Sequence, residues 1–218
     1  MIDFAFKAKK VIENLTDSFE IVLVGNYLEN SEDKTREYID VITKQDSCFT
    51  SVCKPKKGMM GWDMKEGLYH AKGKYLCVID GDGQFPLESI ATCFAEIKSG
   101  GRGLVKTYRS TRNDGVYRRL ISKVYNQLFA IMFPNVKSKD VNSKPKIFSR
   151  EVFEQLRLSS DDWFIDAEIM INLSRLGIKY HEFPVEFKEL NGRASFVKFK
   201  AIFEFIKNMI RYRFKKYE

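Results

Sequence analysis

Two aspartates stand two residues apart directly after a short apolar run. Asp80 and Asp82 follow the segment 75–79 in the sequence YLCVIDGDGQ. In open α/β sheets, ligands bind at the carboxyl ends of the strands. Two carboxylates there can share a hard divalent cation, since Mg²⁺ prefers one or two carboxylates together with phosphate oxygens of a substrate. The competing interpretation is an ordinary Asp-Gly turn between a strand and a helix, and the spacing alone favours neither.

Positive charge is concentrated in two segments of the chain. The net charge is +8, from 37 Lys and Arg against 29 Asp and Glu. Residues 106–119 carry five basic residues and one acidic residue, a net +4, and residues 193–218 carry eight and two, a net +6. The rest of the chain therefore sums to −2. Such segments favour a nucleic acid, an anionic membrane or a phosphorylated substrate as partner, and composition does not choose among them.

Helices and short apolar strands alternate along the chain. These elements must position the two aspartates and the basic residues. The patterns predict strands over 19–24, 48–53, 75–79 and 104–108, and helices over 7–15, 31–42, 62–71, 86–98 and 117–133. This alternation predicts an α/β fold with a mostly parallel sheet flanked by helices. Hydrophobic residues make up 44% of the chain and charged residues 30%, which excludes an intrinsically disordered protein.

The chain ends in a basic amphipathic helix, predicted over 199–217. Its apolar residues recur at helical spacing: Phe199, Ile202, Phe203, Ile206, Met209 and Ile210. Such a helix either packs on the domain, the commoner case, or lies on an anionic bilayer through Lys207, Arg211 and Arg213. We therefore divide the chain into a domain over residues 1–195 and a helix over residues 196–218.

Further sequence features concern the compartment. No apolar run approaches the roughly 18 residues that would indicate a membrane span. Residues 1–10 lack the pattern of a secretory leader. The four cysteines form no CxxC pair, which favours free buried thiols in a reducing compartment. Together these features predict a cytoplasmic protein.

Several motifs, in order along the chain, resemble those of glycosyltransferase family 2. They are KPKKGMMGWDMKEGLYHAKGKYLCVIDGDGQFP, VKTYRSTRNDGVYRRLISKVYNQLF, DVNSKPKIFSR, DDWFIDAEIM, EFPVEF and NGRASF. The chain is most similar to the polyprenyl-phosphate, dolichol-phosphate mannosyltransferase-like branch. The resemblance implies a GT-A-like (Rossmann-like) fold. It also implies transfer of a sugar from a nucleotide-sugar donor to a polyprenyl phosphate acceptor, with Mg²⁺ or Mn²⁺, at the inner face of the membrane.

The resemblance implies roles for the acidic residues. By analogy, Asp80 and Asp82 bridge a divalent metal to the donor diphosphate, with Gln84 close by, and Asp82 counts among the catalytic residues. Asp166 and Glu168 match the family's acidic motif near the acceptor, where one of them orients the acceptor or acts as general base. The alternative for this second pair is a helix N-terminus, where the helix dipole stabilises acidic side chains.

The resemblance also implies roles for basic residues. Arg109, Arg118 and Ser122 match positions that hold the lipid phosphate, and Arg118 and Ser122, four apart on a predicted helix, share one face. Arg193, in NGRASF, falls in a loop that contacts a donor or acceptor phosphate. The implied partners are a nucleotide sugar, a polyprenyl phosphate and an anionic membrane surface. Nucleic acid is disfavoured, because no stacking-platform motif or zinc signature accompanies the charge.

The amino-terminal part of the chain departs from the family pattern. Family members open with a strand and a P-x-Y-N-E-type loop that helps to hold the nucleotide, whereas this chain opens at what is predicted to be the following helix. After the next strand, residues 24–27 read VGNY where the family has an acidic pair. The alternative interpretation is therefore a truncated or non-catalytic relative that acts as a binding or regulatory protein.

Overall fold

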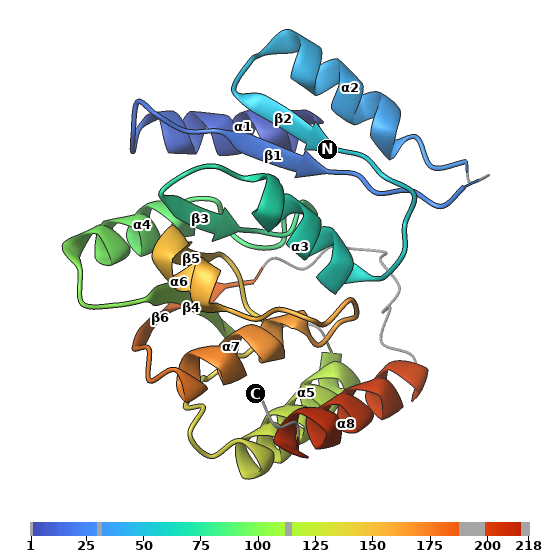
Figure 1. Cartoon of the computed structure of the whole chain (residues 1–218), viewed down its shortest axis with the longest axis vertical. Helices are drawn as coiled ribbons and strands as arrows, with labels where there is room; N and C mark the ends of the chain where they lie inside the picture. Colours follow the sequence, from blue (N-terminus) through green and yellow to red (C-terminus); the bar gives the residue numbers. More distant parts are fainter. Residues whose placement is uncertain (1, 30–31, 112–114, 188–198, 215–218) are drawn as a thin grey trace.

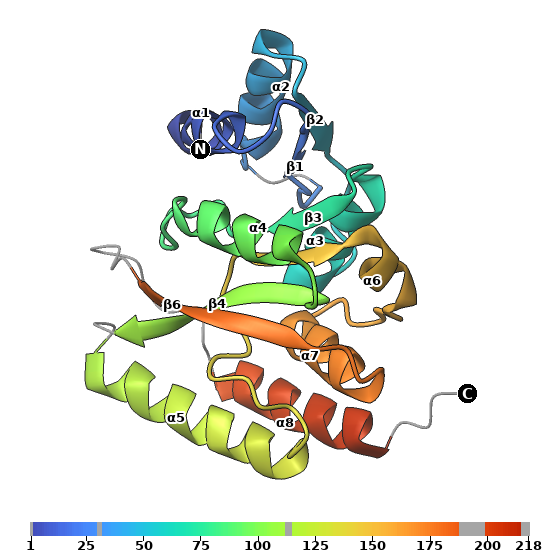
Figure 2. The same cartoon turned by 90° about the vertical axis from the view of Figure 1, so that its left-hand side faces the viewer.

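The computed structural model of the chain describes residues 2–29, 32–111, 115–187 and 199–214 (Figures 1 and 2). Helices and strands alternate through the first two thirds of the sequence, as predicted. In chain order the elements are α1 (Ile2–Glu13), β1 (Ile21–Val24), α2 (Thr35–Gln45), β2 (Phe49–Val52), α3 (Met60–His70), β3 (Tyr75–Val78), α4 (Ser89–Ser99), β4 (Leu104–Thr111), α5 (Gly115–Met132), β5 (Lys146–Ser149), α6 (Arg150–Gln155), α7 (Ile165–Arg175), β6 (Tyr180–Glu186) and α8 (Phe199–Phe214).

The strands form two sheets. β1 and β2 pair in parallel, and a four-stranded sheet has the order β3-β5-β4-β6. β4 and β6 are parallel, whereas β5 runs antiparallel to both β3 and β4. The predicted mostly parallel sheet is thus interrupted by one antiparallel strand. Consequently β3, β4 and β6 end at the same edge of the sheet, and β5 begins there.

Helices cover both faces of the four-stranded sheet. α4 packs on one face, where Cys93 and Ile97 meet Val105 and Ile147. α7 lies on the other face, and nine of its 11 residues are buried, so it is the central helix of the larger core. Figure 2 shows α5 and α8 side by side as a further layer beyond α7. The first turn of α7 therefore lies between the sheet and this outer layer.

The carboxy-terminal helix is part of the core. The Phe164 and Tyr212 rings lie 5.0 Å apart, as do those of Tyr125 and Phe205, so α8 packs on both α7 and α5. Of the predicted apolar stripe, Met209 is buried, whereas Ile206 is 36% exposed and Ile210 49% exposed. The side chains of Phe199, Ile202 and Phe203 are not among the described ones. The helix instead turns its polar-tipped residues inward: Asn208 donates to Asp162, and the Tyr212 hydroxyl donates to Glu168.

Gly61, in the first turn of α3, lies against the loop that precedes α7. Its N–H donates to the carbonyl of Asp162, and a Cβ added to it would lie 2.6 Å or less from two backbone oxygens of that loop. We expect Gly61→Ala to destabilise the protein by about 1–3 kcal/mol, because backbone atoms must move to admit the methyl group. Urea unfolding measures this. Gly81→Ala, whose Cβ meets no atom within 4 Å, is the matched control and should unfold like the wild type.

Candidate active site

The strand register places a lysine opposite the first aspartate of the acidic loop. The ladder between β3 and β5 ends with Val78 opposite Lys146. Two residues beyond that pair, on either strand, stand Asp80 and Lys144. The Lys144 ammonium lies 3.0 Å from Oδ1 and 3.3 Å from Oδ2 of Asp80. It also lies 3.1 Å from Oδ2 of Asp166, in the first turn of α7.

A chain of alternating charges runs from the protein interior to the acidic loop. Lys146 Nζ lies 2.5 Å from Oδ1 of Asp166, which links that carboxylate to both lysines. The side chains of Lys144, Lys146 and Asp166 are at most 2% exposed, whereas that of Asp80 is 36% exposed. The series Lys146–Asp166–Lys144–Asp80 therefore reaches solvent only at Asp80.

The pKa values of these groups follow from burial and from their neighbours. Burial by itself would raise the pKa of Asp166, but Lys144 and Lys146 outweigh it and lower the pKa below its usual value. Burial would lower the pKa of Lys144, but the charges of Asp166 and Asp80 raise it above its usual value. For Lys146, burial dominates and lowers the pKa to about 8. Lys144 is thus a fixed cation at neutral pH.

The acidic loop is held by its own backbone and by aromatic packing. The backbone N–H of Gln84 donates to Oδ1 of Asp82 at 3.1 Å. Gly83 has a φ of 75°, a left-handed conformation that favours glycine at this turn. Phe85 is buried, and its ring centroid lies 5.0 Å from that of Phe187 after β6. The loop is therefore tied to the edge where β6 ends.

Arg109, near the end of β4, lies at the same edge. Its Nε and Nη2 donate to the two carboxylate oxygens of Asp140 at 2.6 and 2.9 Å. Its guanidinium also lies 5.2 Å from the centre of the Phe187 ring. Phe187 thus connects the predicted acceptor-phosphate residue to the acidic loop. Arg109 is half-buried and already paired, which orients its guanidinium.

Glu168 lies elsewhere on α7. Residues two apart on a helix point in nearly opposite directions, so Glu168 faces away from the lysines that contact Asp166. Its carboxylate accepts from the backbone N–H groups of Ser159 and Ser160, both at 2.8 Å, and from the hydroxyl of Tyr212 at 2.7 Å. The structure therefore brings Asp166, but not Glu168, to the Lys144 ammonium that pairs with Asp80. Both acids stand in the first turn of a helix, as the alternative interpretation predicted.

Sequence reasoning did not identify the buried lysines of the site. Besides Lys144 and Lys146, Lys106 on β4 is fully buried, and its ammonium lies 2.9 Å from Oε1 of Glu182. The available signal was KPKIF, in which two lysines alternate along the approach to an apolar strand and so share one face.

The remaining predicted residues stand on α5 or α8 or lie outside the described part of the structure. Arg118 and Ser122 are on α5, but their side chains are not among the described ones, and Arg193 lies outside the described residues. On α8, Lys207, Arg211 and Arg213 are exposed.

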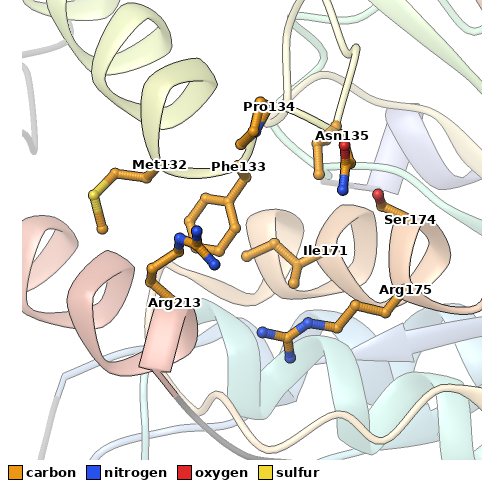
Figure 3. Close-up of a pocket in the computed structure, with 9 residues that line it drawn as sticks. Met132, Phe133, Pro134, Asn135, Ile171, Ser174, Arg175 and Arg213 are labelled. Carbon is orange, nitrogen blue, oxygen red and sulfur yellow. The ribbon is translucent and has the colours of Figure 1, made fainter.

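Arg213 borders a small pocket between the end of α5, α7 and α8 (Figure 3). Arg175, on the α7 side of this pocket, donates to the carbonyl of Tyr212 at 2.6 Å. The pocket lining is Met132, Phe133, Pro134, Asn135, Val136, Ile171, Ser174, Arg175 and Arg213, so the acidic loop is not part of it.

The acidic loop fits a divalent cation that takes some of its ligands from a substrate. Asp80 and Asp82 supply carboxylate oxygens and Gln84 an amide oxygen, which are suitable donors for Mg²⁺ or Mn²⁺. Within the described residues, no group of three or more His, Cys, Asp or Glu side chains is arranged to hold a metal. A cation here therefore needs further oxygen ligands from a bound diphosphate or from water.

Comparison with protein families identifies the group of proteins to which the chain is related. The family model described as Glycosyl transferase family 2 matches residues 8–157, more than half of the chain. The chain belongs to glycosyl transferase family 2. The match includes the acidic loop, Arg109, Lys144 and Lys146, whereas Asp166 and Phe187 lie beyond the matched residues.

Relatives of this family 2 chain include transferases that act on a lipid phosphate. A dolichyl-phosphate beta-glucosyltransferase of Trichomonas vaginalis is 27% identical over 206 residues, which are 88% of this chain and 62% of that protein. A dolichyl-phosphate beta-glucosyltransferase of Dictyostelium discoideum is 26% identical over 99% of this chain and 69% of its own length. The chain thus spans about three fifths of the length of the Trichomonas relative.

Solved structures show the GT-A-like fold. Glucosyl-3-phosphoglycerate synthase from Mycobacterium tuberculosis, in complex with Mn²⁺, UDP and phosphoglyceric acid, superposes with a TM-score of 0.72 at 15% identity. The similarity covers 97% of this chain and 73% of that one. The predicted GT-A-like α/β fold is therefore confirmed.

Proposed function

We propose that this family 2 chain transfers a sugar from a nucleotide-sugar donor to a polyprenyl phosphate. The observation that carries the proposal is that the Asp80–Lys144 pair and Arg109 lie at the same edge of the sheet, with Arg109 linked to the acidic loop through Phe187 and Phe85. Such a site suits a reaction whose donor and acceptor both carry phosphate. The names of the two relatives, dolichyl-phosphate glucosyltransferases, support a lipid phosphate as acceptor.

In the proposed reaction the acidic loop binds the donor. Asp80 and Asp82 hold a divalent cation, with Gln84 beside it. When bound, the cation would neutralise the negative charge that develops on the leaving diphosphate. Lys144 adds a second, fixed positive charge next to Asp80. Asp166 does not reach the solvent-exposed part of the site, so we assign it as a positioning residue that orients Lys144.

The acceptor phosphate is bound by basic residues. We propose that Arg109 holds it together with Arg118, Ser122 and Arg193, the residues that the family resemblance indicates. Asp140, by pairing with Arg109 through two hydrogen bonds, fixes the guanidinium for this role. The phosphate acceptor is already ionised at neutral pH, so the reaction needs no strong general base. A buried Glu168 is compatible with this mechanism.

A transfer assay tests the proposal. The protein is incubated with Mn²⁺ or Mg²⁺, a short polyprenyl phosphate and a panel of uridine and guanosine diphosphate sugars, and lipid-linked sugar is measured. We expect one donor to give time-dependent product. Failure of every donor to react, together with failure to bind in calorimetry, would instead support the non-catalytic alternative.

The outer surface of α8 is proposed to contact an anionic membrane at its cytoplasmic face. Ile206, Ile210 and Phe214 recur every four residues on α8 and are 36%, 49% and 77% exposed, and Lys207 and Arg211 flank them. Ile131 on the neighbouring α5 is 76% exposed. Exposed apolar side chains with basic neighbours suit an anionic bilayer surface. Across the described ranges, the helices are too short or too polar to cross a bilayer.

Reversing the charge of this surface is expected to abolish membrane binding. The variant with Lys207, Arg211 and Arg213 all changed to Glu should lose flotation with vesicles that contain anionic lipid, because each basic residue near the surface contributes about 1 kcal/mol of attraction. A control with Lys44, Lys72 and Lys98 changed to Glu has the same change in net charge on other exposed surfaces and should still float. Equal flotation of the α8 variant and the wild type would contradict the proposal.

A further inference from the structure

Lys144 pairs with the carboxylate of Asp80, on which the proposed metal site depends. Its ammonium lies 3.0 Å from Oδ1 and 3.3 Å from Oδ2 of Asp80, so it contacts both oxygens. The Lys144 side chain is only 2% exposed, which makes it a buried component of the site and not a mobile surface group.

The position of Lys144 is fixed from several sides. Asp166 accepts from its ammonium at 3.1 Å, and Asp166 is held in turn by Lys146. The backbone carbonyl of Lys144 accepts from the Thr107 hydroxyl at 2.5 Å. A side chain restrained in this way cannot move far from Asp80 when another cation approaches.

A divalent cation and the Lys144 ammonium therefore compete for Asp80. A cation bound by Asp80 lies within about 5 Å of the ammonium, where like charges repel each other in a partly buried site. No third acidic, His or Cys ligand of the described residues completes a metal cluster that would offset this repulsion. A bound diphosphate would offset it, because its oxygens accept from the ammonium and also coordinate the metal.

We propose that Lys144 is a built-in cation that makes divalent-metal binding depend on the donor diphosphate. The inference rests on the proposed function, since it concerns the same acidic loop. Without nucleotide, Lys144 neutralises Asp80 and keeps metal affinity low. With nucleotide, the diphosphate provides the negative charge that both cations require, so metal and donor bind together.

Mn²⁺ binding, followed by the electron paramagnetic resonance signal of free Mn²⁺, tests the inference. Wild-type protein should bind Mn²⁺ about tenfold or more tightly with UDP or GDP than without nucleotide. In Lys144→Met, which removes the charge but keeps the length of the side chain, Mn²⁺ binding without nucleotide should tighten by a similar factor. The effect of nucleotide on that variant should shrink accordingly.

Two further variants control the experiment. Lys56→Met removes a lysine whose ammonium lies 2.7 Å from Asp63, outside the acidic loop, and should bind Mn²⁺ like the wild type. Lys144→Arg keeps the charge and should keep the dependence on nucleotide. Thermal melting shows whether each variant is folded, and the wild-type comparison with and without nucleotide decides the coupling even if Lys144→Met does not fold.

The outcomes distinguish this inference from the proposed function. Tight Mn²⁺ binding by the wild type without nucleotide would overturn the coupling. Unchanged binding by folded Lys144→Met would overturn the role of Lys144 and leave the metal site intact. If the nucleotide binds but Mn²⁺ binds in neither state, both the inference and the metal part of the proposed function are overturned.

Discussion

Replacing Asp80 by asparagine is expected to lower the rate of sugar transfer by about a hundredfold to a thousandfold. The substitution keeps the shape of the side chain but removes the negative charge that pairs with Lys144. It also removes a proposed ligand of the divalent cation, so two sources of charge stabilisation at the leaving diphosphate are disturbed together. The initial rate of lipid-linked sugar formation, with donor and acceptor at fixed concentrations, measures the loss.

The Asp80 variant needs a control that separates chemistry from folding. Asp17→Asn changes an exposed aspartate in a turn far along the chain from the acidic loop and should leave the rate unchanged. Unfolding in urea shows whether Asp80→Asn is still folded. A folded Asp80→Asn protein with the wild-type rate would contradict the role of Asp80, and the same result for Asp82→Ala would contradict that of Asp82.

Replacing Glu168 by alanine is expected to destabilise the fold by about 3 kcal/mol or more. The carboxylate is fully buried and accepts from two backbone N–H groups, at Ser159 and Ser160, and from the hydroxyls of Ser159 and Tyr212. Alanine leaves these donors buried with fewer acceptors, and each one costs about 1–3 kcal/mol if nothing replaces the bond. The free energy of unfolding in urea measures the effect. Glu154→Ala, at an exposed position, should be close to neutral.

A second substitution separates the structural role of Glu168 from a catalytic one. Glutamine keeps one acceptor oxygen and the size of the side chain, so Glu168→Gln should be less stable than the wild type but folded. We expect its transfer rate per folded molecule to be retained, because the carboxylate faces α8 and not Asp80. A large loss of rate in a folded Glu168→Gln protein would instead support the catalytic role that the family resemblance implied.

Burial of the lysines connects stability to the chemistry of the site. Lys144 and Lys146 are removed from water, a cost that only nearby carboxylates can offset. Asp166 supplies this compensation for both lysines, and Asp80 supplies it for Lys144 at the surface. Asp80 thus has two partners: it pairs with the buried Lys144, and its exposed side faces the substrate that we propose to bind from solvent.

The strands with the strongest patterns were predicted from the sequence, and those with mixed patterns were not. The strand predicted over 75–79 is β3, and the one predicted over 104–108 is the first part of β4. β5 was missed because only two of its residues, Ile147 and Phe148, are apolar and it begins with a lysine. β6 was missed because Pro184 and Glu182 interrupt its apolar residues. In both strands, pairing with β4 overrides a weak local preference.

The sequence by itself determined the acidic loop, the order of helices and strands around it and the family to which its motifs belong, because these depend on residues that are neighbours along the chain. Only the tertiary structure decided which charges meet. Lys144 and Asp80 are 64 residues apart, and they face each other because β5 enters the sheet antiparallel to β3. Asp166 and Glu168 point in opposite directions from α7, and the tertiary structure decides what each one contacts. The sheet lies on one side of α7, so Asp166 contacts its lysines, and α8 lies on the other side, so Glu168 contacts Tyr212.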